Sequence, residues 1–448
     1  MRAPVFALTL VALPLAAVAE VPHPELAAIA GSVNPEGLRE TIERLADFGT
    51  RHTLSDTVST TRGIGAARRW AKSRFEAIGA LCRGCLVVDT PEHTVSGPRI
   101  PTPAVVQDVI AIQPGTTDPD RVVIISGHID SRNSNILDST HDAPGANDDA
   151  SGVAAVLEAA RILSSRRFAA TVVYAVLSGE EQGLYGGKLL ADYARIRRWR
   201  VEAVLNNDII GGTHGQDGRV VDNEVRVFSE GTRADETSAE AVDRRRSGAE
   251  ADTPSREIAR FMRGLAEAYT PSLRVRMILR SDRFGRGGDQ LPMQEAGYPA
   301  VRITEADENY TRQHQDVRVE GGVAYGDVIA GVDFPYLAKV TALNTVTLAA
   351  LASAPPPPDD LKLAGAVSAD TSLSWAPAPG ASDYRVWWRE TTDPQWREDQ
   401  SLLTGGATTM TLKGINIDDY FFGVSSRTAD GWESPVEFPG PAGAFFRP

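Results

Sequence analysis

The chain has 448 residues and a formal net charge of −13 at pH 7, with 59 acidic side chains against 46 from lysine and arginine. This length allows a large hydrophobic core and more than one domain. The negative charge argues against a nucleic-acid partner, and the short arginine run at 244–246 lies in a polar stretch where a solvated loop is expected.

The first 19 residues have the pattern of a secretory signal peptide. Arg2 is followed by an apolar stretch from Val5 to Val18, and Ala-Val-Ala precedes Glu20. The alternative is a transmembrane anchor, but the stretch is short for a span and Pro14 interrupts it. No other segment is long and apolar enough to cross a bilayer. We therefore expect an exported protein, periplasmic or secreted, without a membrane span once residues 1–19 are removed.

The chain has two cysteines, Cys82 and Cys85, with two residues between them. A structural zinc site made of cysteines needs a second such pair. In an exported protein the pair is expected to form a small local disulfide in an exposed turn.

Hydrophobic periodicity predicts alternating strands and helices within residues 25–352. Short apolar runs without alternation are typical of strands buried on both faces of a largely parallel sheet. Helices are expected where apolar residues recur every three or four positions. The predicted strands are 86–88, 105–112, 122–125, 172–177, 204–205, 225–228 and 300–303, and the predicted helices are 35–48, 63–78, 150–163, 255–269 and 323–351. This order predicts an α/β domain whose mostly parallel central sheet is flanked by helices.

Prolines and polar residues mark the expected interruptions. Pro101 and Pro103 are expected in the turn before strand 105–112, and Pro335 is expected to break the last helix. The polar stretch 211–253 is expected to be an insertion or loop, apart from strand 225–228.

A second domain is predicted after four consecutive prolines, which make residues 353–360 a stiff linker. Five of the seven tryptophans lie beyond it, and alternation replaces helical periodicity. Short strands at 372–375, 384–389 and 420–425, separated by turn residues, predict a small all-β sandwich over 361–448. Exposed tryptophans there could bind a surface or a protein partner; the alternative is that they pack in the core or against the first domain.

Acidic and imidazole side chains follow the predicted buried strands. His128 comes after strand 122–125, Glu180 and Glu181 after 172–177, and Asp208 after 204–205, while Asp148 precedes helix 150–163. In open α/β sheets ligands bind outside the carboxyl ends of the strands, so these side chains are expected to meet. Four carboxylates and an imidazole would repel or stay unsatisfied without a cation between them. Oxygen and nitrogen ligands without thiolates suit zinc, manganese or cobalt.

Two metals need a bridging carboxylate, and Asp148 at the start of a helix is well placed for that role. A two-metal centre activates water and stabilises the oxyanion of a scissile carbonyl or phosphoryl group. It also needs a general base that is not itself a ligand. Glu180 and Glu181 are adjacent loop residues that can point in different directions, so one can bind metal while the other takes the proton.

The segments His-Ile-Asp, Gly-Ala-Asn-Asp-Asp-Ala-Ser-Gly, Gly-Glu-Glu and Asn-Asn-Asp occur in the order typical of the M28 peptidases. Over about residues 30–350 the chain resembles this family of co-catalytic zinc aminopeptidases with an α/β fold. The resemblance implies a site with two Zn²⁺ ions, Mn²⁺ or Co²⁺ being alternatives. In it His128 and Asp208 would bind the first metal, Glu181 the second, and Asp148 both. Glu180 would be the general base and acid, and Asp130 would fix the tautomer of His128.

The last ligand implied by the resemblance is a histidine after a buried strand. His314 in Arg-Gln-His-Gln-Asp fits, with Asp316 as its orienting partner. His141, in the loop before Asp148, is a rival of His128 as a ligand, and His52 is expected to be a structural residue near the site rather than a ligand.

The substrate pocket departs from that of the better-known relatives. Some of them hold the oxyanion with a tyrosine shortly before a Ser-Asp-His segment, and the corresponding stretch 281–292 has neither that tyrosine nor that histidine. Tyr310, Arg283 and Arg286 are the candidates to replace the tyrosine. Glu305, at a strand end, is a candidate contact for a substrate amine, the alternative being a solvated loop acid.

These features favour an exported dizinc exopeptidase, an aminopeptidase that removes N-terminal residues from peptides. A carboxypeptidase-type M28 enzyme and a glutaminyl cyclase-like enzyme with one zinc are alternatives, although the full ligand set argues against the cyclase. A non-catalytic binding protein on the same scaffold is a third reading, but such proteins typically lose ligands or the base. The C-terminal segment resembles a fibronectin type III module through Trp375, Tyr384 and Tyr420, and we expect a spacer, docking or substrate-presenting role for it.

Overall fold

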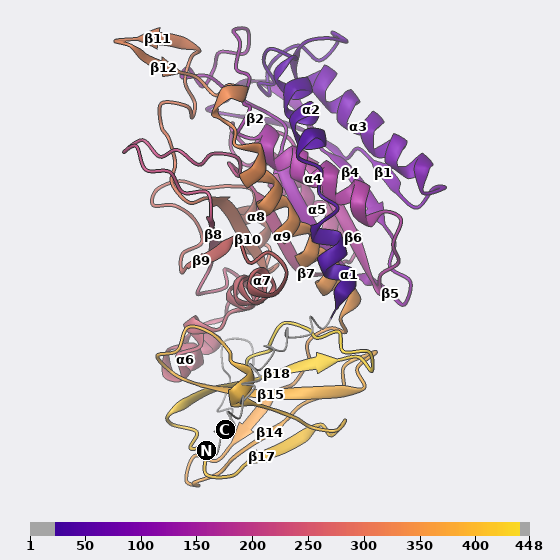
Figure 1. The fold of residues 1–448 in the computed structure, drawn as a ribbon, viewed down its shortest axis with the longest axis vertical. Coiled ribbons are helices and arrows are strands. Elements are labelled where there is room, and N and C mark those ends of the chain that lie inside the picture. The colour runs from indigo at the N-terminus through magenta and orange to yellow at the C-terminus, as the bar shows by residue number, and fades with distance from the viewer. Residues whose placement is uncertain (1–22, 440–448) are drawn as a thin grey trace, which may run out of the picture.

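The structure, a computed structural model, describes residues 23–439. An α/β domain comes first in the chain, and two small β-sheets follow it at one end of the molecule (Figure 1). The predicted signal peptide, residues 1–19, lies outside the described residues. Within the described part, the helices are too short or too polar to span a membrane.

The α/β domain is built on an eight-stranded sheet that is parallel at its centre. The four central strands, in the order β6-β5-β7-β10, run parallel, and β4 and β8 flank them antiparallel. The strands in spatial order are β1 (Val87–Asp89), β4 (Val109–Gln113), β6 (Ala170–Leu177), β5 (Asp118–His128), β7 (Arg200–Asn207), β10 (Ala300–Glu305), β8 (Glu224–Ser229) and β9 (Arg274–Ile278). The predicted α/β fold with a mostly parallel central sheet is confirmed.

Helices cover both faces of this sheet because its central strands are apolar on both sides. Neighbouring strand residues alternate between two cores: Val123 and Ile125 face one, and Val122 and Ile124 face the other. The first core is closed by α1 (Pro24–Ala30), α2 (Pro35–Ala46), α3 (Gly63–Leu81), α4 (Ala150–Leu163), α7 (Pro254–Tyr269) and α9 (Phe334–Ser353). The second core is smaller and is closed by α5 (Tyr185–Ile196) and α8 (Gln290–Glu295).

The strand register brings the carboxyl ends of the central strands to one edge. His128 on β5 pairs with Leu177, the last residue of β6, and Ser126 pairs with Asn206 near the end of β7. On the other side of β7, Ile303 of β10 pairs with Asn207. The residues that follow these strands therefore emerge side by side.

Two predictions about prolines are wrong, and the predicted helix 323–351 begins later than expected. Pro101 and Pro103 lie inside β3 (Ile100–Gln107), which pairs with β2 (Glu92–Gly97) in a two-stranded sheet where a strand tolerates missing amide donors. Pro335 lies in the first turn of α9, where its missing N–H has no partner to lose, so it starts the helix instead of breaking it. The residues before it form the hairpin of β11 (Arg318–Glu320) and β12 (Val323–Tyr325).

The polar stretch that contains the arginine run is not entirely loop. Residues 238–247 form α6 (Ser238–Ser247), in which Thr237 caps the first turn and exchanges hydrogen bonds with Glu240. The arginines at 244–246 lie in the last turn, where cations interact favourably with the helix dipole. α6 buries none of its residues, so capping and charge define it and hydrophobic periodicity does not. The predicted disulfide between Cys82 and Cys85, just after α3, is confirmed.

The C-terminal segment forms two three-stranded antiparallel sheets around a shared core. One sheet contains β13 (Lys362–Ala364), β14 (Thr371–Ser374) and β17 (Thr409–Leu412), and the other contains β16 (Ser401–Leu403), β15 (Asp383–Glu390) and β18 (Tyr420–Arg427). Leu373 and Trp375 pack with Val386 and Phe422 between them. The described tryptophans are all buried or half-buried, so none is an exposed binding residue.

A buried polar network joins the two domains at α7. Asp252, just before this helix, contacts both Arg260 of the first domain and Arg389 of the second. The indole N–H of Trp396 donates to Glu257 Oε2 at 2.8 Å. Arg389 is 1% exposed, so its charge depends on these partners for compensation.

Replacing Arg389 by Ala is expected to destabilise the protein by about 3 kcal/mol, because it leaves part of a buried ionic network unpaired. Thermal and denaturant unfolding of the full chain measure the change. Arg397 forms an exposed ion pair with Asp399, so Arg397→Ala serves as the control and should change the unfolding free energy by less than about 0.5 kcal/mol. Equal stability of the two variants would show that the network contributes nothing.

Candidate metal centre

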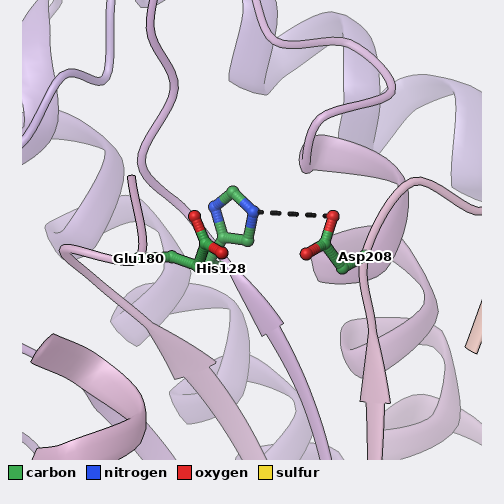
Figure 2. Close-up of side chains that lie close together, drawn as sticks. All are labelled: His128, Glu180 and Asp208. Atoms are coloured by element: carbon green, nitrogen blue, oxygen red, sulfur yellow. Dashed lines mark ion pairs between the residues drawn. The ribbon is translucent and has the colours of Figure 1, made fainter. Parts of the chain in front are cut away.

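Six of the predicted site residues converge at the carboxyl edge of the sheet. Ligand atoms of His128, Glu180 and Asp208 lie within 4.8 Å of one another, and those of Asp148, Glu181 and His314 form a second group with the same spacing. Figure 2 shows the first group, with the imidazole of His128 between the two carboxylates. His128 ends β5, Glu180 follows β6 and Asp208 follows β7, so the strand ends supply this group.

Asp148 contacts both groups. Its Oδ1 lies 3.2 Å from Nε2 of His128, and its Oδ2 lies 3.0 Å from Nε2 of His314. Glu181 Oε1 is 3.1 Å from the same atom of His314, whereas Asp208 Oδ1 is 4.0 Å from Nε2 of His128. The two oxygens of Asp148 therefore face different groups, as a bridging carboxylate requires.

The close approach of β5 and α4 brings His128 next to Asp148. Gly127 precedes His128, and a Cβ atom there would lie 2.6 Å from the carbonyl carbon of Gly152 in the first turn of α4. Asp149 stabilises the contact between β5 and α4, because its carboxylate accepts hydrogen bonds from the amides of His128 at 3.0 Å and Gly152 at 2.9 Å. Asp149 thus orients the main chain on both sides of this contact.

The donor set fits a metal centre. Nε2 of His128 and Oε1 of Glu181 are buried; they lie 3.2 Å from Asp148 and 3.1 Å from His314, respectively, but neither contact has good hydrogen-bond geometry. Burial raises the pKa of Asp148, but contacts with His128 and His314 outweigh it and hold this pKa well below its usual range. Burial lowers the pKa of His314, but Glu181 and Asp148 raise it to about 10. These groups pair with protonated imidazoles, and a divalent cation would displace those protons.

Glu180 differs electrostatically from its neighbour Glu181. Burial raises the pKa of Glu180 well above its usual range, with Asp208 and Glu181 adding to the effect and His128 opposing it. The pKa of Glu181 is lowered, since His314 and Arg132 outweigh its burial. Two adjacent glutamates thus have opposite shifts, which is the pattern expected of a proton acceptor beside a ligand.

Asp130 is placed to hold the turn that carries both glutamates. Its carboxylate accepts the amide hydrogens of Glu180 at 3.3 Å and Glu181 at 3.1 Å, and the hydroxyl of Thr53 at 3.1 Å. Nδ1 of His128 lies 3.1 Å from the main-chain oxygen of Asp130 and 3.6 Å from its carboxylate. The main-chain oxygen therefore makes the closer contact with the imidazole.

Replacing Asp130 by Ala is expected to weaken metal binding by about 10- to 100-fold, because the turn bearing Glu180 and Glu181 loses its acceptor. Competition with a chromogenic chelator measures the affinity. Asp192→Ala, at an exposed position on α5, should leave it unchanged. Unaltered affinity in the Asp130 variant would remove that residue from the centre.

Two predicted contacts need correction. Glu305 is 2% exposed and does not line the cleft that contains Asp148, Glu180, Glu181 and Asp208. Its Oε2 accepts from Asn147 at 2.8 Å and from the amide of Gly212 at 2.6 Å. It positions the loop before Asp148 and is neither a substrate contact nor a solvated acid. Asp316 does not orient His314, because it accepts hydrogen bonds from Ser134 instead.

The other predicted residues lie as follows. Tyr310 is 55% exposed and lines the cleft. His52 is buried near the site, with Nε2 3.0 Å from the carbonyl oxygen of Ile136. His141 is exposed, pairs with Asp138 and belongs to neither metal group.

Sequence reasoning missed two arginines that hold the ligands. Arg302 on β10 is fully buried and forms an ion pair with Asp208. Arg132 donates to Glu181 Oε2 at 2.8 Å and lies 2.6 Å from Nδ1 of His314, in the place predicted for Asp316. A charged residue inside the apolar run Ala-Val-Arg-Ile was a usable signal for Arg302. Arg132 lies in a polar loop and offered none.

Comparison with known proteins agrees with this geometry. The model of Peptidase family M28 matches residues 108–318, a segment that contains all six clustered side chains. A protein of Pyricularia oryzae named "Probable zinc metalloprotease" is 40% identical over 433 residues, which cover 94% of this chain and 86% of that protein. A protein of Leptosphaeria maculans with the same description is 40% identical over 94% of this chain and 98% of its own length.

The fold is also similar to that of a solved structure. The Legionella pneumophila LapA aminopeptidase superposes with a TM-score of 0.52 and 18% identity, over 78% of this chain and 77% of the other. Since close relatives match the chain over nearly its whole length, it belongs to Peptidase family M28 and is a zinc metalloprotease.

Proposed function

We propose that this protein is an exported exopeptidase with two zinc ions, an aminopeptidase that removes N-terminal residues from peptides. The observation that carries the proposal is the pair of three-residue groups joined by Asp148. His128 and Asp208 would hold one zinc ion, Glu181 and His314 the other, and Asp148 both. When bound, the ions supply Lewis acidity toward the scissile carbonyl and the attacking water.

Glu180 is the general base of the proposed reaction. It lies beside His128 and Asp208, and burial raises its pKa, so its oxygen is suited to accept a proton from water. The same group then returns the proton to the amine that leaves. Asp130 supports it by holding the main-chain amides of the turn.

The shape of the site supports action at a chain end. The cleft that contains Asp148, Glu180, Glu181 and Asp208 has a volume of about 610 Å³. This is the size of a small-ligand pocket, which suits a terminal residue and its neighbours better than a long extended peptide. LapA, with a similar fold, is described as an aminopeptidase.

Export is supported by the pattern of residues 1–19 and by the disulfide at Cys82, which suits an oxidising compartment. Expression with the native N-terminus should yield a mature protein that begins at Glu20, as Edman sequencing or mass spectrometry of the intact chain would show. A chain that keeps its first residues and stays in the cytoplasm would contradict export. The two C-terminal sheets around Trp375 suit the proposed fibronectin type III-like module.

Hydrolysis of matched peptides with free and N-acetylated termini tests the activity. We expect cleavage of the free-amine peptides alone, and loss of cleavage with a chelator. Equal cleavage of blocked peptides would replace the aminopeptidase assignment by carboxypeptidase or endopeptidase action. Conversion of N-terminal glutamine to pyroglutamate without peptide cleavage would replace it by glutaminyl cyclase activity.

A further inference from the structure

We propose that the cleft beside the metal groups binds a carboxylate of the substrate, through Arg99 and Arg286. This inference rests on the proposed function and names the substrate class for the same site. The cleft is lined by four arginines, Arg99, Arg132, Arg283 and Arg286. The described carboxylates that line it, Asp148, Glu180, Glu181 and Asp208, all belong to the two metal groups.

Arg99 is a cation with unused hydrogen-bonding capacity at the edge of the cleft. It lies in the turn between β2 and β3 and is exposed. Its Nη1 donates to the main-chain oxygen of Glu181 at 2.9 Å, which fixes the guanidinium near the metal groups. Within residues 23–439 no carboxylate forms an ion pair with it. A guanidinium held in this way can offer its remaining donors to a carboxylate.

Arg286 belongs to a cluster with more cations than anions. Arg226, Arg283 and Arg286 all pair with the single carboxylate of Glu308, at 2.6, 3.2 and 2.8 Å. Asp282 adds a second carboxylate, but it also faces Arg302. Arg286 is the most exposed of the three arginines on Glu308, with 31% of its side chain accessible, and it lines the cleft.

The other two arginines that line the cleft are already bound to groups of the protein. Arg132 is held by Glu181 and His314, and Arg283 by Asp282, Glu308 and the main-chain oxygen of Gly287. Arg286 also contacts Glu308 and Gln313, but its side chain is more exposed than those of Arg132 and Arg283. Arg99 and Arg286 therefore remain as the substrate contacts.

The charge balance of the occupied site favours an anion. Two divalent ions would balance the four carboxylates of the metal groups, and the arginines would then leave the cleft positive. A cationic lysine or arginine side chain of a substrate would be repelled, whereas a carboxylate would form charge-assisted hydrogen bonds. That carboxylate is either an aspartate or glutamate side chain or the C-terminal group of a short peptide.

Four dipeptides separate these sources: Glu-Ala and Gln-Ala, each with a free and with an amidated C-terminus. Glutamate and glutamine have nearly the same shape, so their comparison isolates charge. We expect kcat/KM for Glu-Ala amide to exceed that for Gln-Ala amide by about tenfold or more if the side chain is bound. A similar advantage of free over amidated Gln-Ala identifies the C-terminal carboxylate. Equal values for all four peptides would overturn the inference.

Variants assign the effect to the named residues. Arg99→Gln and Arg286→Gln should each remove most of the preference, by raising KM for the charged peptide much more than KM for Gln-Ala amide. Arg286→Lys should restore part of it, and raised salt should weaken it. Arg263→Gln, on α7, is the matched control and should keep the full preference. An unchanged preference in both glutamine variants would show that these arginines do not bind the carboxylate.

The outcome also distinguishes this inference from the proposed function. Cleavage of all four dipeptides and of a leucine amide at equal rates would retain the aminopeptidase and reject the carboxylate site. Cleavage of none of these substrates by the zinc-loaded full chain would reject the proposed function itself.

Discussion

Glu180→Gln is expected to lower kcat by about 10²- to 10⁴-fold while the protein keeps its metal. Glutamine preserves the size of the side chain but cannot take a proton from water. The turn that carries residue 180 is held through its main-chain amide by Asp130, so the substitution should leave the backbone in place. Steady-state kinetics and metal analysis of the same preparation measure both quantities.

Glu181→Gln provides the informative contrast to that variant. Glu181 lies 3.1 Å from Nε2 of His314 and is paired with Arg132, so its loss should reduce metal content as well as activity. Glu320→Gln, at an exposed position on β11, should change neither. If Glu180→Gln instead loses metal as Glu181→Gln does, Glu180 is a ligand of the group that it shares with His128 and Asp208.

Removal of metal is expected to abolish hydrolysis and to destabilise the fold. Asp148, Glu181 and Asp208 are buried and Glu180 is half-buried, and a cation compensates the charges of these four facing carboxylates. Binding at a free metal concentration about 1,000 times the Kd stabilises the folded state by about 4 kcal/mol. Thermal unfolding with and without a chelator should therefore show a lower midpoint for the stripped protein.

Zinc added back should restore both the midpoint and the activity. The Glu181→Gln variant, with a weakened second group, should show a smaller shift on chelation than the unmodified protein. An identical midpoint and full activity after exhaustive chelation would exclude a metal-dependent site at this edge of the sheet.

The sequence was most informative where local pattern and topology coincide. His128, Glu180 and Asp208 follow short apolar strands, and the register of β5, β6 and β7 carries these three residues to one edge. A parallel sheet makes that outcome predictable, since its strand ends lie together whatever the loops do. Asp148 was predictable from its place just before α4, the helix that follows β5.

Contacts between distant loops could not be predicted in this way. Arg132 and His314 are 182 residues apart, and the pairing of Asp316 with Ser134 leaves Arg132 beside the imidazole. Asp316 was predicted as the orienting partner only because it is close to His314 in the sequence. Glu305 follows the strand-end rule, yet its carboxylate points to Asn147 and Gly212, which only the folded loop reveals.

Local signals also misled where the tertiary setting decides. Pro335 reads as a helix breaker, but Asp333 caps the first turn of α9 and makes that position suitable for proline. α6 has no apolar face, so periodicity could not find it, although its Thr237 and Glu240 form a recognisable capping box.

Titration of the metal-free protein with zinc tests the central claim most directly. Hydrolysis of an unblocked aminoacyl amide is followed as zinc is added, and bound zinc per chain is measured at each point. We predict that the unmodified protein binds two equivalents and that activity is complete when both are bound, while Glu180→Gln binds two equivalents without turnover. Full activity at one equivalent, or equal turnover in the Glu180 variant, would contradict a two-zinc peptidase with Glu180 as its base.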